Sequence, residues 1–535
     1  MKKNAIILAA GKSSRFAPFT YERPKGLFRV KGQILIERQI EQLIEAGIEN
    51  IYVVIGYMKE KFFYLEQKYS QVTLLINNKF GMKGNLYSLF VAKDYLCNSY
   101  ISYADYYFVN NPFVNDLTDK SYHSCIYINK KFKEFSVTSS DANVITQINI
   151  GGNNQLAMIG HAFLTDSFAK RFVSFMESEI EDFRVSSLFW EEFFAKHIYE
   201  LTLSVKEMPY DEIQEFNSIE NLCQFDSDFL YNVDSDIINN ICETLRCNPI
   251  NITDIKVINA GLTNVSFSFY IDGIQYVYRH PGGTAGNLIN RSSEIYAQNK
   301  ALEIGIDQSV IAINQEGWKI SYCVQNLGDC DFRKYPQQMC VAMDFLRKLH
   351  NVDINQASTV KNFDNVEEGL RLIKLASLTK GNLLDYFSKE INKIKQLDRY
   401  LKEDAERLGL KRCLCHNDVY EPNFLATKSG ELYLIDWEYA GINDPANDIC
   451  GLFGRYDYTE TEIEIIIKEY LGTNYSEDLF RHFYAFIPIT AFYFMAWGCY
   501  KGSVGEDDGF FFLPCYKNIH RFIDKALSFF EQNNN

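Results

Sequence analysis

Several features that define common protein classes are missing from the sequence. The 13 cysteines are an odd number and include no C-x-x-C pair, so they favour buried free thiols in a reducing compartment over a disulfide framework. No stretch of about 18 apolar residues appears, which predicts that the chain does not span a membrane. The apolar run before Gly11 is too short for a signal peptide and predicts a first β-strand instead. These absences together predict a cytoplasmic protein.

The charge balance argues against a further group of partners. The formal net charge is -15, so nucleic acid and an anionic membrane surface are poor partners, whereas a cationic small molecule would be attracted. The composition, with 47% hydrophobic and 23% charged residues, is that of a globular protein. A chain of 535 residues without internal repeats or low-complexity runs is expected to form about two to four domains.

The stretch from Cys415 to Cys450 has the layout of a phosphotransferase active site. It reads H-N-D-x-x-x-x-N and then, after an apolar run, I-D-W-E. Transfer of a phosphoryl group from ATP needs a carboxylate that orients the attacking hydroxyl, and oxygen ligands for Mg²⁺. Asp418 fits the first role, and Asn423 with Asp436 fits the second. Single polar residues at strand ends occur in any α/β protein, but this spacing is far more specific and predicts a kinase-type site.

Residues 1 to about 225 alternate between strand and amphipathic-helix patterns, which predicts a doubly wound, mostly parallel sheet. Ligands bind such a sheet at the carboxyl ends of its strands, where GKSSR (residues 11–15) and Asp105 fall. The backbone N–H groups of GKSSR suit phosphate. Arg15 and Lys25 add positive charge for a triphosphate, and Asp105 is a candidate Mg²⁺ ligand. The segment lacks both the P-loop pattern and the G-x-G-x-x-G pattern of a dinucleotide site.

Residues 250–330 predict a small β-sheet at the start of the second half. A hairpin there carries small residues that let the backbone approach the phosphates of ATP: Gly261, Thr263 and Asn264. Arg279 follows on the next strand, where a kinase-like fold keeps its phosphate-binding cation, and Glu294 is a candidate partner for it. The backbone from Val324 to Leu327 is expected to meet adenine, and the remaining chain, from about residue 335, is expected to be helical.

The N-terminal half resembles nucleotidyltransferases that activate phosphorylated small molecules, and in particular the bacterial CTP:phosphocholine cytidylyltransferases. The resemblance covers residues 3–225 and is carried by LAAGKSSRFAPFT, RPKGLFRVKGQILIERQIEQL, GNLYSLFVAKDYL and YADYYF. It implies that CTP is bound by Ala10, Gly11, Ser13, Arg15, Lys25, Asn85 and Ser88.

The same resemblance implies Asp105 and Asn217 as Mg²⁺ ligands, and Phe135 and Trp190 as residues that face the choline head group. Three places depart from the family pattern. Ser13 stands where a second glycine is usual, and Leu164-Thr165 stands where a Trp-Asp pair is expected. The E-I-D segment of the family appears as Glu215-Phe216-Asn217, so Asn217 stands where a second metal carboxylate is usual. An asparagine still offers a carbonyl oxygen to a metal, but with less charge.

The C-terminal half resembles choline and ethanolamine kinases of the aminoglycoside-phosphotransferase-like group. The resemblance implies Asp418 as the base, Asn423 and Asp436 as Mg²⁺ ligands, and Arg279 as a contact of ATP, and Glu438 fits the habit of that group. Choline offers no hydrogen-bond donor at its quaternary nitrogen, so it needs aromatic faces and a nearby carboxylate. The aromatic candidates are Trp437, Tyr493 and Trp497.

Taken together, the two resemblances imply an α/β nucleotidyltransferase domain (residues 1–228) fused to a bilobal, protein-kinase-like α+β domain. The N-lobe is expected at residues 229–327 and the helical C-lobe at residues 328–535. The predicted reactions are phosphorylation of choline by ATP and transfer of CMP from CTP to phosphocholine, both with Mg²⁺. Ethanolamine, aminoethylphosphonate, a sugar phosphate or an antibiotic remain alternative substrates, and one half without catalysis, acting as a regulatory module, remains an alternative arrangement. The oligomeric state is not predicted.

Overall fold

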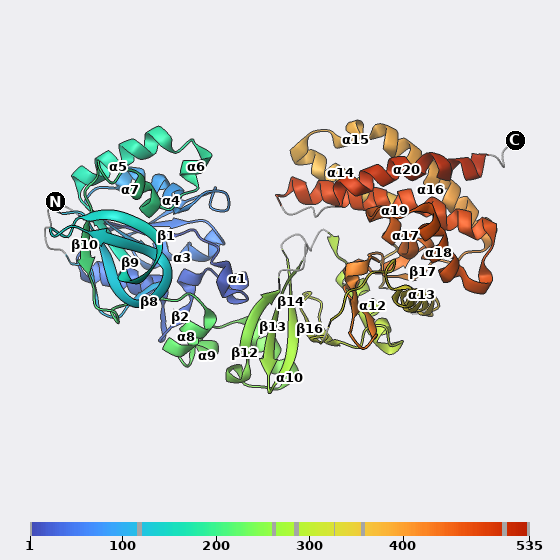
Figure 1. The fold of residues 1–535 in the computed structure, drawn as a ribbon, viewed down its shortest axis with the longest axis horizontal. Helices are drawn as coiled ribbons and strands as arrows, with labels where there is room; N and C mark the ends of the chain where they lie inside the picture. Colours follow the sequence, from blue (N-terminus) through green and yellow to red (C-terminus); the bar gives the residue numbers. More distant parts are fainter. Residues whose placement is uncertain are drawn as a thin grey trace. The chain divides into compact units, whose positions relative to one another are not determined.

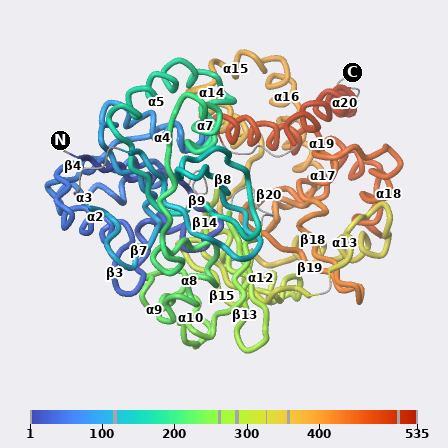
Figure 2. The backbone as a smooth tube through the Cα atoms, turned by 60° about the vertical axis from the view of Figure 1, so that its left-hand side comes forward, coloured from blue at the N-terminus to red at the C-terminus, as the bar shows by residue number. Residues whose placement is uncertain are grey.

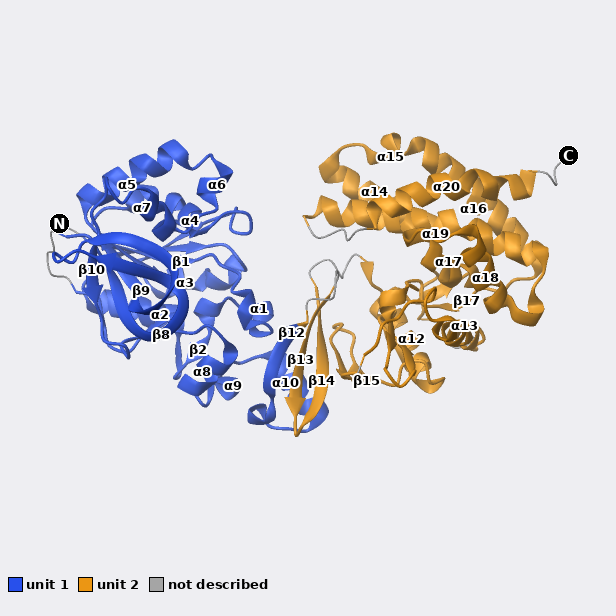
Figure 3. Ribbon diagram, in the orientation of Figure 1, with its two compact units in different colours: residues 1–257 blue, residues 258–535 orange. Residues whose placement is uncertain are grey.

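The computed structural model describes residues 3–114, 120–258, 264–282, 288–325, 327–354, 359–505 and 511–531. The chain divides into two compact units, residues 1–257 and residues 258–535 (Figure 3). Each unit has its own hydrophobic core.

The N-terminal unit is built on a seven-stranded sheet with the order β10-β8-β9-β6-β1-β4-β5 (Figure 1). The strands are β1 (Asn4–Ala9), β4 (Asn50–Ile55), β5 (Val72–Ile76), β6 (Ser99–Tyr103), β8 (Tyr122–Ser139), β9 (Ile145–Leu164) and β10 (Ser204–Glu207). β6, β1, β4 and β5 run parallel to one another, whereas β9 runs antiparallel to β6 and to β8. The predicted mostly parallel sheet is confirmed, and the long β8–β9 hairpin is an addition to it.

Strand β1 is buried on both faces, which is why its sequence is a continuous apolar run. Its alternate residues enter different cores: Ile6 and Leu8 face one, and Ile7 and Ala9 face the other. On one side the sheet packs against α2 (Leu35–Glu45), and on the other against α4 (Asn85–Val91), α5 (Asp166–Glu179) and α7 (Trp190–Lys196). Helices on both faces make the sheet doubly wound.

Shorter elements complete this unit. They are α1 (Phe19–Glu22), β2 (Arg29–Val30), β3 (Gln33–Ile34), α3 (Tyr64–Lys68), β7 (Tyr106–Phe108), α6 (Phe183–Ser186), β11 (Ile213–Glu215), α8 (Ile219–Phe225), α9 (Phe229–Asn232) and α10 (Asp236–Leu245). β11 pairs antiparallel with β7, so the chain near residue 215 returns to the carboxyl end of β6.

The compact N-terminal unit extends beyond the domain boundary predicted at residue 228. The ring of Phe229 lies 5.4 Å from that of Phe19 and 5.9 Å from that of Phe28. The N–H of Ile237 at the start of α10 donates to Glu22 Oε1 over 3.0 Å. These contacts hold α9 and α10 on the first unit, and the division by compactness falls within β12 (Thr253–Ile258).

The C-terminal unit begins with a five-stranded sheet in the order β12-β13-β14-β16-β15. The strands that follow β12 are β13 (Asn264–Ile271), β14 (Ile274–Pro281), β15 (Val310–Ile313) and β16 (Lys319–Tyr322). Asp272 and Gly273 join β13 to β14 with φ of 49° and 80°, the two left-handed residues of a type I′ hairpin turn. The predicted small sheet is therefore present, and α12 (Arg291–Glu303) follows it.

The remainder of this unit is mainly helical. It contains α13 (Pro336–His350), α14 (Asn365–Lys380), α15 (Leu383–Tyr386), α16 (Ser388–Leu408), α17 (Pro445–Arg455), α18 (Glu460–Leu471), α19 (Glu477–Ser503) and α20 (Phe512–Glu531). Two small hairpin-like sheets lie among the helices: β17 (Cys413–Cys415) with β20 (Gly441–Asn443), and β18 (Phe424–Ala426) with β19 (Leu432–Leu434). Helices α19 and α20 lie side by side (Figure 1 and Figure 2).

Helix α19 corrects one expectation. Among the described residues it alone has the length and composition of a membrane-crossing helix, whereas the sequence was expected to contain no such stretch. Of its most apolar window, 94% is buried inside the structure. Its side chains belong to the core of the C-terminal unit, together with those of α14, α17 and α20.

Candidate active sites

The loop after β1 carries the predicted phosphate-binding residues of the N-terminal unit. Ser13 has a left-handed backbone with φ 47° and precedes the short 3₁₀ helix η1 (Ser14–Phe16). A side chain disfavours this conformation, which glycine adopts freely. A second glycine at this position is therefore the less strained choice. Ala10 is buried, and a methyl group on Gly11 would meet no described atom within 4 Å, so the loop is open on that side.

Lys25 connects the two edges of this site. It lies in η2 (Lys25–Leu27) with its side chain buried, and Nζ donates to Asp105 Oδ2 over 2.8 Å and to the carbonyl oxygen of Phe216 over 2.7 Å. Close packing of the next residue makes this approach possible, because a Cβ on Gly26 would lie 2.8 Å from Cβ of Ala104. The structure thus brings Lys25 and Asp105 together.

Asn217 bridges a cation and a carboxylate. Its Oδ1 accepts from Arg15 Nη1 over 3.3 Å, and its Nδ2 donates to Glu134 Oε1 over 3.0 Å. Glu215 lies close by, and burial together with the charges of Asp105 and Glu134 raises the pKa of Glu215 to about 7. The negative charge gathered here fits a bound divalent cation, with Asp105 and Glu215 as carboxylate ligands.

Glu134 and Glu215 were missed in the sequence. Only the return of β11 beside β7, which pairs Glu215 with Tyr106, places Glu215 next to Asp105. The segment Glu215-Phe216-Asn217 contains a signal for this residue, because it keeps a carboxylate two positions before Asn217.

Asn85 and Ser88 on α4 form hydrogen bonds with neighbouring residues, partly buried for Asn85 and buried for Ser88. Asn85 begins α4, donates to the Tyr103 hydroxyl over 2.7 Å and accepts from the N–H of Trp190 over 2.8 Å. Ser88 accepts from Asn77 over 2.9 Å. Both side chains therefore have protein partners, and the predicted contact with the base or ribose stays a prediction.

The two predicted aromatic contacts of the choline head group lie in different surroundings. Trp190 is 1% exposed, and its ring stacks on His123 in the core at a centroid distance of 5.6 Å. Phe135 is half-buried, and its ring meets that of Phe189, which is 50% exposed, at 6.0 Å. The structure therefore brings Phe135 together with Phe189, whereas Trp190 at the start of α7 packs into the core against the sheet.

In the C-terminal unit, one carboxylate fixes the loop that follows β17. Asp448 Oδ2 accepts from the N–H of His416 over 2.8 Å, and Oδ1 accepts from the N–H of Asn417 over 2.7 Å. Asn417 has a left-handed backbone, with φ 63°. His416 Nε2 lies 2.9 Å from the carbonyl oxygen of Ile435, so this side chain ties the loop to the strand that leads to Asp436.

Asp418, which follows in this loop, is held on both oxygens. Asn423 Nδ2 donates to Asp418 Oδ2 over 3.0 Å, and Arg455 Nη1 donates to Asp418 Oδ1 over 2.6 Å. The donated amide leaves the side-chain oxygen of Asn423 available as a hard ligand. Asp436, with a left-handed φ of 68°, lines the same cavity, so this pair fits a Mg²⁺ ion beside the phosphates.

Arg455 was missed in the sequence. Its guanidinium is buried and lies 4.1 Å from the ring centroid of Tyr420 and 3.9 Å from that of Phe494. Arg455 ends α17, and α17 itself is anchored by Asp448. Nothing in the local sequence GLFGRYD distinguishes this arginine from a surface residue.

A second buried cation serves the opposite wall. Arg279 on β14 pairs with Glu294 on α12, with 2.5 Å between Nη2 and Oε1, and its Nη1 lies 3.5 Å from Asp436 Oδ1. Nε and Nη1 of Arg279 are buried, and no described residue accepts a hydrogen bond from either. These two nitrogen atoms are therefore suited to donate hydrogen bonds to a phosphate group. Lys319 on β16 lines the cavity beside them and was also missed; burial and the charge of Arg279 lower its pKa.

The cavity between the sheet and the helices has a volume of about 480 Å³. Val324 and Leu327 are among its lining residues, and their predicted contact with adenine stays a prediction. Asn264 is buried and donates to Glu438, so its side chain is engaged. Gly261 and Thr263 lie outside the described residues, and their predicted approach to the phosphates stays a prediction.

The three predicted aromatic residues separate into one at the cavity and two in the core. Trp497 lines the cavity, and its Nε1 donates to the Tyr439 hydroxyl over 2.9 Å. Trp437 is fully buried and donates to the carbonyl oxygen of Leu434 over 3.0 Å. Tyr493 is 2% exposed and is not among the described residues that line the cavity.

Glu438 supplies a further carboxylate in the cavity that Trp497 lines. It is buried and lines the cavity, and burial together with the charge of Asp436 raises its pKa to about 8. A bound cation would favour its ionised form. Trp497, Tyr439 and Glu438 therefore form a combination of aromatic faces and a carboxylate that suits an ammonium group.

Two family models match separate parts of the chain. Residues 5–148 match the MobA-like NTP transferase domain, and residues 255–502 match choline/ethanolamine kinase.

Individual relatives match the N-terminal unit closely. A 2-aminoethylphosphonate cytidylyltransferase of Lancefieldella rimae is 34% identical over 236 residues, which cover 43% of this chain and 94% of that protein. A choline-phosphate cytidylyltransferase of Streptococcus pneumoniae is 36% identical over 217 residues, which cover 41% of this chain and 94% of that protein.

Among solved structures, the choline kinase LicA of Streptococcus pneumoniae is 21% identical, with a TM-score of 0.44, covering 54% of this chain and 98% of that chain.

Proposed function

Since the chain belongs to the family of the choline-phosphate and 2-aminoethylphosphonate cytidylyltransferases and also carries a choline/ethanolamine kinase domain, we propose that it makes CDP-choline in two steps. The C-terminal unit phosphorylates choline with ATP, and the N-terminal unit transfers CMP from CTP to the phosphocholine so formed. The observation that carries this proposal is the presence in one chain of an alcohol kinase domain and of a cytidylyltransferase domain that consumes a phosphorylated alcohol.

The kinase domain also argues against 2-aminoethylphosphonate as the substrate of the N-terminal unit. A kinase joins phosphorus to an alcohol oxygen, whereas phosphorus in a phosphonate is bonded to carbon. The product of the C-terminal unit is therefore a phosphate ester. A cytidylyltransferase that acts on a phosphonate would have no use for that product.

In the kinase reaction, the hydroxyl of choline attacks the γ-phosphorus of ATP, its proton passes to Asp418, and the bond between the γ-phosphorus and the bridging oxygen of ADP breaks. Arg455 and Asn423 fix the two carboxylate oxygens of Asp418, which orients the base. Arg279 and Lys319 place positive charge at the phosphates. Asn423 and Asp436 would hold Mg²⁺, which would supply positive charge against the negative charge of the phosphates.

The ammonium group of choline is assigned to the end of the cavity formed by Glu438, Tyr439 and Trp497. Arg455 already occupies the faces of Tyr420 and Phe494. A second cation beside Arg455 would meet repulsion of about 3 kcal/mol at a separation of 6 Å and an effective dielectric constant of about 20. Glu438 supplies a carboxylate beside Tyr439 in the sequence, and the charge of Arg279 also acts on it, so the proposed place for the quaternary nitrogen rests on this carboxylate and on the aromatic side chains that line the same cavity.

In the cytidylyltransferase reaction, an oxygen of phosphocholine attacks the α-phosphorus of CTP, and pyrophosphate leaves. The attacking oxygen is already ionised, so no general base is required. Lys25 and Arg15 stabilise the charge on the phosphates, and Asp105 with Glu215 and Asn217 would hold Mg²⁺, which would supply further positive charge there. The 13 free cysteines and the nucleotide substrates support a cytoplasmic location.

Two assays on the full chain separate the two reactions. Asp418→Asn is expected to abolish ATP-dependent phosphorylation of choline and to leave the conversion of phosphocholine and CTP to CDP-choline intact. Asp105→Asn is expected to do the reverse. Asp457→Asn, in an exposed ion pair with Arg521, is the control that should change neither. CDP-choline formation at the wild-type rate by Asp105→Asn would remove the assignment of the N-terminal unit.

The acceptors are compared by kcat/KM. Choline is expected to exceed ethanolamine and an aminoglycoside in the kinase assay, and phosphocholine is expected to exceed 2-aminoethylphosphonate in pyrophosphate release. A preference for the phosphonate would show that the two units serve different pathways.

A further inference from the structure

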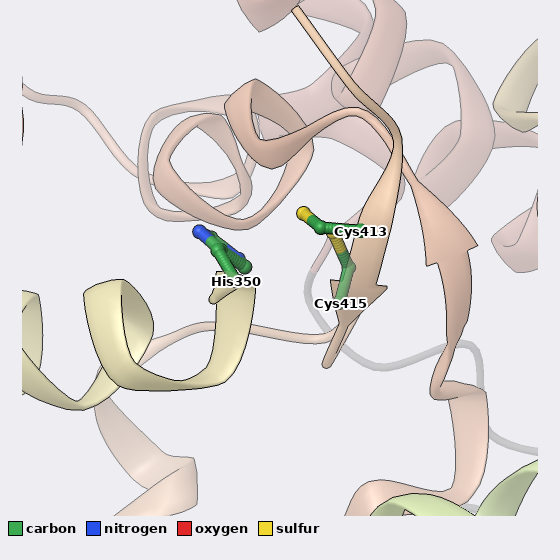
Figure 4. A group of neighbouring side chains, drawn as sticks. All are labelled: His350, Cys413 and Cys415. Atoms are coloured by element: carbon green, nitrogen blue, oxygen red, sulfur yellow. The ribbon is translucent and has the colours of Figure 1, made fainter. Parts of the chain in front are cut away.

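A cluster of one histidine and two cysteines lies behind the loop that carries Asp418. Cys413 and Cys415 are two residues apart on β17, so their side chains share one face of the strand, and His350 ends α13, which packs against β17 (Figure 4). One ligand atom of each residue lies within 4.8 Å of the others. We propose that these three side chains form a binding site for a thiophilic divalent metal ion of the Zn²⁺ class.

The spacing of the two sulfur atoms fits such an ion. The Sγ atoms of Cys413 and Cys415 are 3.7 Å apart. Two zinc–sulfur bonds of about 2.3 Å at a tetrahedral angle place the sulfur atoms about 3.8 Å apart. An ion can therefore be bound by both sulfur atoms without a change in the backbone of β17. The contact between the two thiols lowers the pKa of Cys413, whereas burial and the same contact raise the pKa of Cys415, so the ion itself must displace the proton of Cys415.

His350 is oriented by a carboxylate, as metal-binding histidines commonly are. Nε2 lies 3.0 Å from Asp448 Oδ2, and Nδ1 lies 2.7 Å from the Tyr470 hydroxyl. With its proton on Nε2 donated to Asp448, the imidazole keeps a lone pair on Nδ1. When the ion binds, Nδ1 gives up its hydrogen bond to the Tyr470 hydroxyl and binds the ion instead. The charges of both thiols act on that hydroxyl, which places it near the two sulfur atoms. Its oxygen would then be the fourth ligand of the ion.

The donor set separates this ion from the Mg²⁺ of the reaction. Two sulfur atoms and an imidazole select Zn²⁺ and related ions, whereas Mg²⁺ takes oxygen ligands such as Asp436. Binding deprotonates both thiols, so two protons leave for each ion and the two thiolates balance its charge. The ion would join α13 to β17, the strand that directly precedes the loop with Asp418. Because it would bind the folded state, it would stabilise the kinase unit against unfolding by mass action.

The test uses the full chain, reduced, stripped with a chelator and titrated with Co²⁺ in excess Mg²⁺. Equimolar Co²⁺ is expected to produce the thiolate-to-cobalt charge-transfer band and the absorption of tetrahedral cobalt, both displaced by Zn²⁺. Cys413→Ser and Cys415→Ser should abolish the charge-transfer band or greatly reduce it, and His350→Gln should weaken binding about 10-fold or more. Cys450→Ser is the matched control, because its buried thiol contacts only the carbonyl oxygen of Phe483 among its described hydrogen-bond partners.

A second measurement covers variants that fail to fold. Wild-type protein is alkylated during brief partial unfolding with and without Zn²⁺, and the modified thiols are mapped by mass spectrometry. Zn²⁺ is expected to protect Cys413 and Cys415 and to leave the exposed Cys340 reactive. Equal labelling with and without Zn²⁺, or a charge-transfer band that survives in the Cys413→Ser/Cys415→Ser variant, would overturn the proposal. Both readouts are independent of catalysis, so they remain valid whatever the two units synthesise.

Discussion

Arg455 donates to Asp418 over 2.6 Å, and its guanidinium lies between the rings of Tyr420 and Phe494. A third contact, from Nη2 to the carbonyl oxygen of Val419 over 3.0 Å, leaves the cation little freedom. Burial raises the pKa of Asp418, and the charge of Arg455 opposes that rise. Arg455 therefore aims the base and counteracts the rise of its pKa, from the end of a helix 37 positions further along the chain.

Replacing Arg455 with Met is expected to lower kcat/KM of the kinase reaction about 100-fold or more, because the base loses both its orientation and its counter-charge. The acidic limb of the pH–rate profile should move to higher pH, since the pKa of Asp418 rises without the arginine. Arg455→Lys should restore part of the rate, and Arg521→Met, which removes an exposed cation, is the control. An unshifted pH–rate profile would mean that Arg455 contributes packing but does not influence the pKa of Asp418.

Replacing Lys25 with Met is expected to abolish CDP-choline formation from phosphocholine and CTP. The substitution removes a buried cation that contacts both Asp105 and the carbonyl oxygen of Phe216, so the charge and the geometry of the site change together. The kinase rate should not change, which serves as an internal control for folding. Wild-type KM for CTP in this variant would contradict a role in nucleotide binding.

His482 makes stability depend on pH. It is buried between Asp404 and Asp444, at 3.0 and 3.1 Å; burial lowers its pKa, and the two carboxylates outweigh burial and raise it from 6.5 to about 9. Because the pKa is higher in the folded state, this contribution to stability is complete below pH 6.5 and is lost as the pH rises through about 9. Its size is about 3 kcal/mol at most.

Urea unfolding of the isolated full chain at about pH 6 and about pH 9.5 measures this effect. Wild type should lose free energy of unfolding over that interval, and His482→Gln should be less stable throughout and lose less. His520→Gln, at a half-exposed histidine beside Glu390, is the control that keeps the wild-type slope. Parallel slopes in wild type and His482→Gln would exclude the assignment.

Gly84 and Gly81 provide a matched pair for the packing of the N-terminal site. A Cβ on Gly84 would lie 2.1 Å from the carbonyl oxygen of Leu188, whereas the nearest described atom to a Cβ on Gly81 is 4.0 Å away. Gly84→Ala is expected to destabilise this unit by about 1–3 kcal/mol and to displace Asn85 at the start of α4. Gly81→Ala should leave the melting temperature unchanged. Calorimetry measures the melting temperatures of both variants, and equal changes in the two would refute the prediction that Gly84 is the more closely packed glycine.

Much of the fold could be predicted from the sequence because local patterns determine it. The apolar run of β1 and the helical periodicity of α2 indicate the doubly wound sheet. Asp418 and Asp436 follow short strands that are close in sequence, so their spacing alone indicates that they line one cavity. The long β8–β9 hairpin was not anticipated, because its exposed parts lack a continuous apolar pattern.

The rest of the site depends on contacts between residues far apart in sequence. Trp190 in the N-terminal unit and Trp437 in the C-terminal unit were each candidates for contact with a choline group, but the local backbone turns both rings into the hydrophobic core of their own unit. Arg455, Lys319 and Glu215 reach their sites through α17, β16 and β11, and no local pattern encodes those approaches.

Asp448 binds the two consecutive backbone N–H groups ahead of Asp418 and also contacts His350. The conformational entropy of this loop is therefore lost when the chain folds, and substrate binding has little of it left to remove. Each turnover would then begin from a preorganised base, and the affinity for ATP and acceptor would not be reduced by the ordering of a mobile segment. The slow step of the kinase is accordingly expected in phosphoryl transfer or product release rather than in the assembly of the catalytic loop.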